Sequence, residues 1–98
     1  MFDDVIYGSF IWSELKNRLN FMRHGLTFEE AVLAFSDPHS VILEDPAHSL
    51  IEERFFCIGL VGLKVATVRF THREGKVRII GAGFWRRGKK FYEEQTKI

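Results

Sequence analysis

The sequence predicts an α+β fold, in which an antiparallel β-meander packs against N-terminal helices and a helix ends the chain. In the first half, apolar residues recur at helical spacing, whereas the second half has β-branched and aromatic runs separated by glycine-containing turns. Helices followed by strands favour helices packed on one face of a sheet. With 98 residues and an apolar fraction of 46%, the chain suffices for one hydrophobic core, so we expect a single domain over residues 1–98.

The first helix is expected over residues 13–25. Ser13 is a candidate N-cap, and Gly25 is a residue type that commonly ends helices. Three apolar residues at helical spacing form one stripe, namely Leu15, Leu19 and Met22. Such a stripe is typical of a helix that packs against a core.

A second, shorter helix is expected over residues 27–38. Thr27 and Glu30 have the spacing of a capping box, and Pro38 stops the helix. Its apolar stripe comprises Phe28, Ala31, Val32 and Phe35. A short strand at residues 41–43 and a polar loop follow.

The meander is expected over residues 54–60, 63–71 and 76–82. These runs are rich in β-branched and aromatic residues. We expect two-residue loops at Val61-Gly62 and at Glu74-Gly75, because short glycine-containing turns are typical of hairpins. The tail over residues 86–98 is expected to form a helix weakened by its glycine.

Other features restrict the class of protein. No apolar run approaches the roughly 20 residues of a membrane span, and the acidic start is not typical of a secretory signal. The single cysteine, Cys57, lies in an apolar run, which favours a small buried residue over a catalytic thiol. We therefore expect a cytoplasmic protein.

Charge is divided unevenly along the chain. Residues 1–53 hold three basic and ten acidic residues, whereas residues 54–98 hold eleven basic and three acidic ones. This asymmetry predicts a basic face that binds a polyanion. Nucleic acid is the obvious candidate, and an acidic protein partner is the alternative.

The predicted hairpin loops fix which residues share a face of the sheet. Counting outward from the loops places Arg54 opposite Arg69, and Thr71 opposite Arg78. One face is then apolar, with Phe55, Val68, Phe70, Val77 and Ile79. The other face carries Glu52, Arg54, Arg69, Thr71, Arg73, Lys76 and Arg78. Clustered arginines suit a phosphate, whereas a merely solvated face is the alternative.

Three segments of the chain resemble the BrnT family of bacterial type II toxins. They are "FIWSELKNRLNFMRHGLTFEEAVLAFSDP", "DPAHSLIEERFFCIG" and "THREGKVRII", and the likeness runs from about Phe10 to Tyr92. The resemblance implies a small ribonuclease of RelE-like fold that inhibits translation. It also implies a ribbon-helix-helix antitoxin of the BrnA type, operator binding only through that antitoxin, and a homodimer within the complex as one arrangement.

The chain departs from the family pattern near its C-terminus. Gly81, Gly83 and Gly88 stand where serine, arginine and glutamate are usual, and Ser13 replaces an acidic residue. An arginine at position 83 would help to bind a phosphate, although Arg86 and Arg87 lie close enough in sequence to substitute. The alternative is therefore a catalytically impaired member that acts as an antitoxin-binding corepressor module.

Metal-free RNA cleavage requires a base, an acid and cations around the phosphate. The candidate proton-transfer groups are His48, Glu52 and Glu53. The candidate phosphate clamp consists of Arg54, Arg69 and Arg78, of which Arg54 and Arg78 are also counted as catalytic. Further RNA contacts are expected from Thr71, Arg73, Lys76, Arg86 and Arg87. Asp45 and His48 offer too few ligands for a closed zinc site, so no metal or cofactor is expected.

Several of these side chains have an equally simple structural interpretation. His48 could only order its own loop, and His24 suits the C-terminal end of a helix. Trp85 and Tyr92 could stack on bases, whereas packing is the simpler interpretation for Trp12. The sequence leaves these alternatives open.

Overall fold

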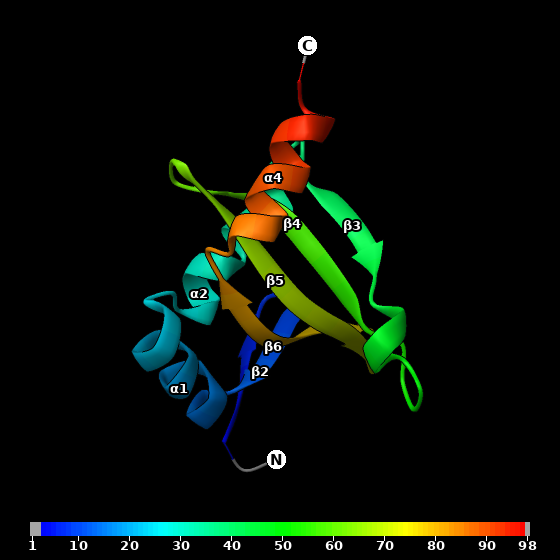
Figure 1. The fold of residues 1–98 in the computed structure, drawn as a ribbon. Coiled ribbons are helices and arrows are strands. Elements are labelled where there is room, and N and C mark those ends of the chain that lie inside the picture. The colour runs from blue at the N-terminus through cyan, green and yellow to red at the C-terminus, as the bar shows by residue number, and fades with distance from the viewer. Residues whose placement is uncertain (1–2, 98) are drawn as a thin grey trace.

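A mixed β-sheet lies at the centre of the fold, with helices on both of its faces (Figure 1). The computed structural model describes residues 3–97. Its six strands follow the order β1-β2-β6-β5-β4-β3. The strands are β1 Asp4–Tyr7, β2 Phe10–Ser13, β3 Val41–Glu44, β4 Phe55–Val61, β5 Lys64–Arg73 and β6 Lys76–Gly83. The helices are α1 Glu14–His24, α2 Phe28–Ala31, α3 Leu33–Ser36 and α4 Arg86–Gln95, with a 3-10 turn at Pro46–His48. The α+β class and the terminal helix are confirmed.

Two apolar clusters lie on opposite faces of the sheet. Cys57 belongs to the larger cluster, with Phe28 and Ala34 from the N-terminal helices, whereas its neighbour Ile58 packs with Tyr92 of α4. Successive residues of a strand point to opposite faces. The expectation that all helices cover one face is therefore wrong, because α4 covers part of the second face.

Helix α1 has the predicted ends but not the predicted buried face. The Ser13 hydroxyl accepts a hydrogen bond from Lys16 N, and Gly25 adopts the left-handed conformation with φ 69°. The expected stripe is exposed, with Met22 at 79%. Asn17 and Asn20 are the buried residues of this helix.

Asn20 joins α1 to the edge of β6. Its Nδ2 donates to the carbonyls of Leu26 and Ala82 at 2.9 Å each, and its Oδ1 accepts from Ala82 N at 3.0 Å. Strand β2 pairs in parallel with β6 at Val77 and Arg78, so within residues 3–97 the rest of this edge lacks a neighbouring strand. The amide therefore replaces a strand at this point, which explains why a polar side chain is buried here.

One hairpin has the predicted register and the other does not. Arg73 opposes Lys76 and Thr71 opposes Arg78, as expected from the Glu74-Gly75 turn. In the β4–β5 hairpin, Val61 opposes Lys64, so that Arg69 faces Phe56 rather than Arg54. The turn residues here are Gly62 and Leu63, with φ 63° at the glycine. The shift of two residues leaves every side chain on its expected face.

The N-terminal hairpin formed by β1 and β2 was not predicted from the sequence. The two strands pair antiparallel, with Asp4 opposite Ser13, and turn at Gly8 with φ 62°. This hairpin brings the start of the chain to the sheet beside β6. The charges of Asp3 and Asp4 are thereby placed near the basic strands.

Two glycines allow backbone segments to approach closely. A Cβ atom on Gly59 would lie 2.4 Å from the Ala34 carbonyl oxygen, and one on Gly88 would lie 2.0 Å from Thr67 Oγ1. Gly59 therefore allows α3 to lie close to β4, and Gly88 allows α4 to lie close to β5. Gly88 was expected only to weaken the terminal helix, but it also permits the packing of α4 on the sheet.

Asp37 connects the end of α3 to β4 and α4. Its carboxylate accepts hydrogen bonds from the Tyr92 hydroxyl, from Leu60 N at 2.8 Å and from His39 N at 2.9 Å. Desolvation opposes ionisation, but these hydrogen bonds prevail and lower the pKa of Asp37. Burial raises the pKa of Tyr92 to about 12, and the hydrogen bond to Asp37 adds to the shift.

Tyr92 should make stability depend on pH in the alkaline range. An unfolded tyrosine has a pKa of about 10, so the folded pKa is raised, and the neutral phenol stabilises the fold fully below about pH 10. This contribution is lost as the pH rises from about 10 to about 12. We expect the free energy of unfolding, measured in urea, to fall less steeply over this range in Tyr92→Phe than in the wild type. Tyr7→Phe, at an exposed position, is the control, and equal slopes for wild type and Tyr92→Phe would contradict the assignment.

Cys57 has no access to solvent. Its side chain is 0% exposed, and burial raises the pKa of the thiol to about 12. The expectation of a small buried residue is confirmed, because a nucleophilic thiolate requires a lowered pKa and access to substrate. Within residues 3–97, the structure contains no helix of the length and apolarity that crossing a membrane requires.

Candidate functional site

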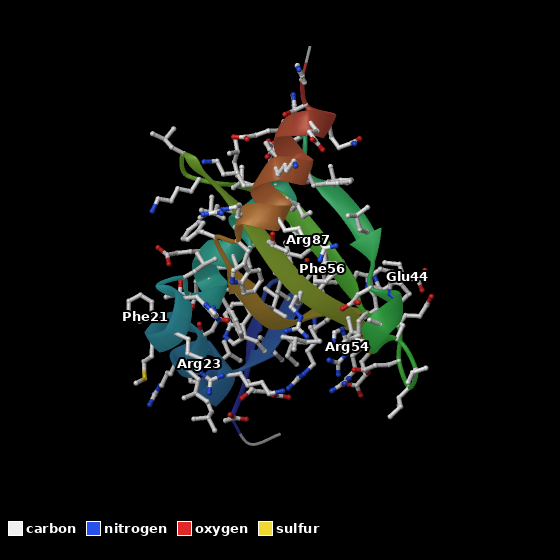
Figure 2. All side chains as sticks on the ribbon, viewed as in Figure 1. Phe21, Arg23, Glu44, Arg54, Phe56 and Arg87 are labelled. Carbon is white, nitrogen blue, oxygen red and sulfur yellow. The ribbon has the colours of Figure 1, made fainter. Side chains whose placement is uncertain are left out.

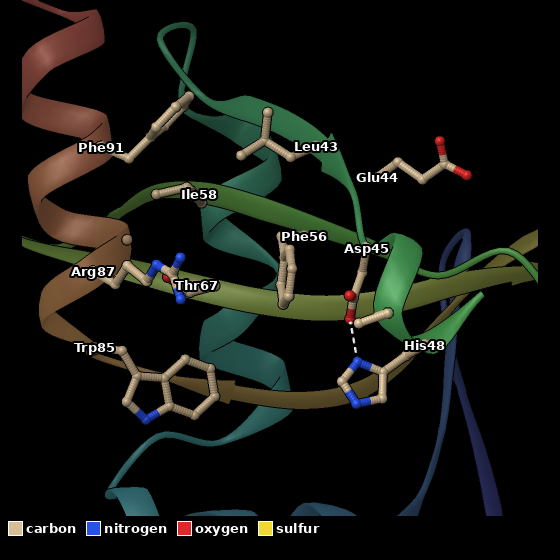
Figure 3. Close-up of a pocket in the computed structure, with 12 residues that line it drawn as sticks. Leu43, Glu44, Asp45, His48, Phe56, Ile58, Thr67, Trp85, Arg87 and Phe91 are labelled. Carbon is tan, nitrogen blue, oxygen red and sulfur yellow. Dashed lines mark hydrogen bonds and ion pairs between the residues drawn. The ribbon is translucent and has the colours of Figure 1, made fainter. Parts of the chain in front are cut away.

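A cleft of about 650 Å³ lies on the sheet face that α4 covers in part (Figure 3). Its walls come from β3 and the 3-10 turn on one side and from α4 on the other. Phe56 and Thr67 form part of its floor. We call it the His48 cleft, after the histidine at its rim.

His48 and Asp45 form a hydrogen-bonded pair at this rim. His48 Nδ1 lies 2.8 Å from Asp45 Oδ2, and Asp45 is buried whereas the His48 side chain is 57% exposed. A carboxylate on Nδ1 favours the tautomer that carries its proton there, which leaves Nε2 as a proton acceptor. The hydrogen bond orders the loop, and the same arrangement equips His48 for proton transfer.

The opposite wall of the cleft carries a cation and an indole ring. Arg87 and Trp85 lie across the cleft from His48, and the Arg87 guanidinium points into the cleft (Figure 3). Among the described residues, no carboxylate forms an ion pair with Arg87. Arg86, the neighbouring candidate, is exposed and does not line the cleft.

Trp85 occupies the space next to Gly83. A Cβ atom at position 83 would lie 2.5 Å from Trp85 Cε2, so a larger residue there requires the indole to move. The glycine at position 83 and the position of Trp85 are therefore linked. Arg87 supplies a cation on the wall beside it.

Arg54 and Arg73 share one carboxylate beyond the cleft. Arg73 Nη2 donates to both oxygens of Glu52 at 2.9 and 3.1 Å, and Arg54 Nη2 lies 3.5 Å from Glu52 Oε2. The hydrogen bond from Arg73 is the main cause of the lowered pKa of Glu52. Arg54 Nε is buried and has no hydrogen-bond partner among the described residues. Figure 2 shows Arg87, Phe56 and Arg54 one after another on the same face of the sheet.

Arg78 binds a carboxylate of the N-terminal hairpin. Its Nη1 and Nη2 donate to the two oxygens of Asp4 at 3.2 and 2.9 Å. This hydrogen bonding lowers the pKa of Asp4 and raises the pKa of Arg78. Arg78 is therefore already paired within the chain.

The other predicted site residues are spread over the same region. The Thr71 hydroxyl donates to the Glu53 carbonyl at 2.6 Å, and the side chain of Thr71 is buried. Glu53 is exposed, and Lys76 lies beside the hairpin turn opposite Arg73. Arg69 is half-buried and has no ion pair with a carboxylate of residues 3–97. The structure thus places His48 and Arg87 in one cleft, with the other predicted residues outside it.

Two site features were not predicted from the sequence. Asp4 is separated from Arg78 by 74 positions, and no local sequence pattern predicts that ion pair. Asp45 and His48 were weighed as metal ligands, although their spacing of three residues in a polar loop could also have indicated a hydrogen-bonded pair. The described part of the chain contains no group of three or more His, Cys, Asp or Glu side chains that could bind a metal.

Comparison with known proteins identifies the family. A search of curated protein sequences finds no match. A family model described as "Ribonuclease toxin, BrnT, of type II toxin-antitoxin system" matches residues 12–88, which include the sheet from β3 to β6 and His48. The chain therefore belongs to the BrnT family of ribonuclease toxins of type II toxin-antitoxin systems.

Proposed function

We propose that this chain is a metal-independent endoribonuclease toxin of RelE-like fold, a single domain that cleaves RNA in the bacterial cytoplasm and inhibits translation. One observation carries the proposal: the Asp45–His48 pair faces Arg87 across a cleft on the sheet (Figure 3). A proton acceptor and a cation on opposite walls are what a phosphodiester between them requires.

The proposed reaction uses the 2′-hydroxyl of RNA as the nucleophile. His48 Nε2 takes the 2′-OH proton, the 2′-oxygen bonds to the adjacent phosphorus, and the bond to the 5′-oxygen breaks. The products are a 2′,3′-cyclic phosphate and a 5′-hydroxyl, which receives its proton from an acid. Arg87 stabilises the charge that develops on the phosphate oxygens. Glu52 is held by Arg73 and Glu53 is exposed outside the cleft, so the proposal assigns neither carboxylate as this acid.

The remaining cations extend the site along the sheet. Arg54 and Arg69 are proposed to bind RNA phosphates nearest the cleft, with Arg73 and Lys76 farther along. Because Arg78 is paired with Asp4, we assign it an indirect role: it fixes the N-terminal hairpin beside β6. RNA that approaches this face competes with intramolecular carboxylates for Arg54 and Arg73.

Membership of this family implies an antitoxin partner. We propose that the antitoxin is a ribbon-helix-helix protein of the BrnA type that covers much of the basic face. In this proposal the complex binds operator DNA only through the antitoxin, and two copies of the toxin associate within it.

A second candidate function is that of an antitoxin-binding corepressor without turnover. The observation that favours it is the neutralisation of Arg73 and Arg78 by Glu52 and Asp4. Two cations expected to bind phosphate are thereby occupied within the chain itself.

The first test separates these two candidates. Purified protein is incubated in EDTA with an end-labelled RNA and with the same sequence in 2′-deoxy form, and the ends of the products are identified. We expect cleavage of the RNA alone, with cyclic phosphate ends. Salt-sensitive binding without cleavage would overturn the ribonuclease proposal and favour the corepressor.

A further inference from the structure

A second cleft, of about 290 Å³, lies between α1 and the strands β5 and β6. It opens at a β-bulge in the β5–β6 pairing: Phe70 opposes Ile79 whereas Arg69 opposes Gly81, so β6 has one extra residue at this point. Bulges re-aim side chains and are frequent beside functional sites. Arg69 and Gly81 both line the cleft, so the arginine reaches it from the middle of the sheet. We call this space the α1 cleft.

The lining of the α1 cleft is strongly basic. Its charged and titratable residues are Lys16, Arg23, His24 and Arg69. No carboxylate lines it among the described residues, and within residues 3–97 none of Lys16, Arg23 and Arg69 forms an ion pair. The other arginines on this sheet differ, since Glu52 or Asp4 neutralises Arg54, Arg73 and Arg78. The α1 cleft therefore keeps its positive charge available.

The helix itself explains only part of this charge. Arg23 and His24 stand in the last turn of α1, where the helix dipole favours cations. Lys16 stands in the first turn, where the dipole disfavours a cation, and Arg69 belongs to a strand. The three cations Lys16, Arg23 and Arg69 around one cleft have a cost in mutual repulsion that a bound anion would relieve.

Trp85 connects the two clefts. It lines both the α1 cleft and the His48 cleft, and its ring is only half-buried. His24 holds the indole edge-on, with ring centroids 5.2 Å apart, which helps to fix its orientation. A half-buried indole between the His48 cleft and a basic cleft suits single-stranded nucleic acid, in which bases and phosphates alternate.

We propose that the α1 cleft is a second nucleotide subsite, which binds a phosphate of the RNA strand beside the scissile one while a base stacks on Trp85. Lys16, Arg23 and Arg69 hold this phosphate. The neighbouring phosphate then lies in the His48 cleft with Arg87. This inference rests on the proposed ribonuclease function, but it concerns binding and can fail independently of cleavage.

The test measures binding without cleavage. The probe is a labelled RNA hexanucleotide with 2′-O-methyl riboses, which lacks the 2′-hydroxyl nucleophile. Fluorescence anisotropy at several salt concentrations gives the affinity and its salt dependence for wild type, for Lys16→Ala/Arg23→Ala and for Arg18→Ala. Arg18 is the matched control, because it lies on the same helix, is exposed and does not line the α1 cleft. For each phosphate that the double variant no longer neutralises, the slope of log K against log salt should shrink by about 0.7, with no such change in Arg18→Ala.

Tryptophan fluorescence reports the stacking directly. Trp12 is fully buried, so quenching by the hexanucleotide reports on Trp85, the other tryptophan of the chain. We expect quenching in the wild type, and a loss of affinity of about 5- to 150-fold in Trp85→Leu. Thermal denaturation of each variant shows whether it is folded.

The outcomes separate the two proposals. Quenching and salt-dependent binding without cleavage of unmodified RNA would support the subsite and overturn the ribonuclease. Cleavage with unchanged binding in the double variant, or equal losses in Arg18→Ala, would overturn the subsite alone. A hexaglutamate peptide that binds as tightly as the RNA would show that the α1 cleft recognises an acidic protein instead. Absence of any binding by the hexanucleotide would also overturn the subsite.

Discussion

Replacement of His48 by alanine is expected to slow RNA cleavage by about 10²- to 10⁴-fold, the usual contribution of a positioned proton-transfer group. His48 Nδ1 is held by the buried Asp45, so the imidazole has a fixed orientation at the rim of the cleft and Nε2 is left to accept a proton. Because the side chain is 57% exposed, its removal should leave the fold intact. Single-turnover cleavage of an end-labelled RNA in EDTA measures the effect, and urea denaturation measures the stability.

Two further variants make the result specific. His39→Ala removes an exposed histidine that does not line the His48 cleft and should cleave at the wild-type rate. Asp45→Asn leaves His48 in place but removes the charge that orients it, so we expect a smaller loss than in His48→Ala. Wild-type activity in His48→Ala would transfer the proton-transfer role to Glu52 or Glu53.

The largest effect on stability is expected from Gly59→Ala. The added Cβ would lie 2.4 Å from the carbonyl oxygen of Ala34 and 3.1 Å from the Cβ of Ser40. A backbone oxygen within a helix cannot rotate away, so α3 must move off β4. Overpacking of this kind costs about 1–3 kcal/mol, which lowers the midpoint of thermal unfolding by about 4–20 °C in a domain of this size.

Gly81→Ala is the matched control for this substitution. Both glycines are buried in strands of the same sheet, but a Cβ on Gly81 would meet only Asn20 Oδ1, at 3.8 Å. This is an ordinary contact distance, and we expect little change in the thermal midpoint. If the two variants melted together, the close approach of α3 to β4 would not be a determinant of stability.

The two hairpins show which parts of the sheet can be predicted from sequence. Glu74-Gly75 is a strong turn signal, and the structure has the expected register around it. The sequence favours Val61-Gly62 as the first turn, whereas the chain turns at Gly62 and Leu63, with the leucine fully exposed. Hydropathy argues against an exposed leucine in a turn, which is why the sequence favours the wrong pair of turn residues. The predicted register of this hairpin is therefore wrong by two residues, whereas the predicted alternation of faces is correct.

Helix α1 shows a different limit of sequence patterns. Apolar periodicity selects the stripe of Leu15, Leu19 and Met22, which is exposed, because such a pattern presumes that buried positions are apolar. Asn17 and Asn20 are buried instead, since each amide satisfies backbone groups that would otherwise be unpaired. Asn17 Oδ1 accepts from Phe28 N at 2.8 Å, and Asn20 pairs with Ala82. Such contacts join residues distant in sequence and leave no periodic signal.

The sequence indicated several residues of the candidate site, but it did not indicate which of them lie together. His48 and Arg87 were both expected as functional residues, and the structure places them across one cleft. The arginine clamp was expected to be free, yet Arg78 is paired with Asp4 because an unpredicted hairpin carries that carboxylate to β6. Counting charge along a strand indicates a basic face but does not show which cations already have partners.

The hydrogen bonds of Asp37 have a consequence for the binding of RNA in the His48 cleft. The Tyr92 hydroxyl donates to this carboxylate at the end of α3, so α4 is connected to the helical layer on the other face of the sheet. Helix α4 carries Arg87 and one wall of the His48 cleft. That wall is thus preorganised, and little binding free energy is lost to ordering it when RNA arrives. A loosened wall, as in Tyr92→Phe, would then appear as weaker RNA binding even at neutral pH, where the protein is folded.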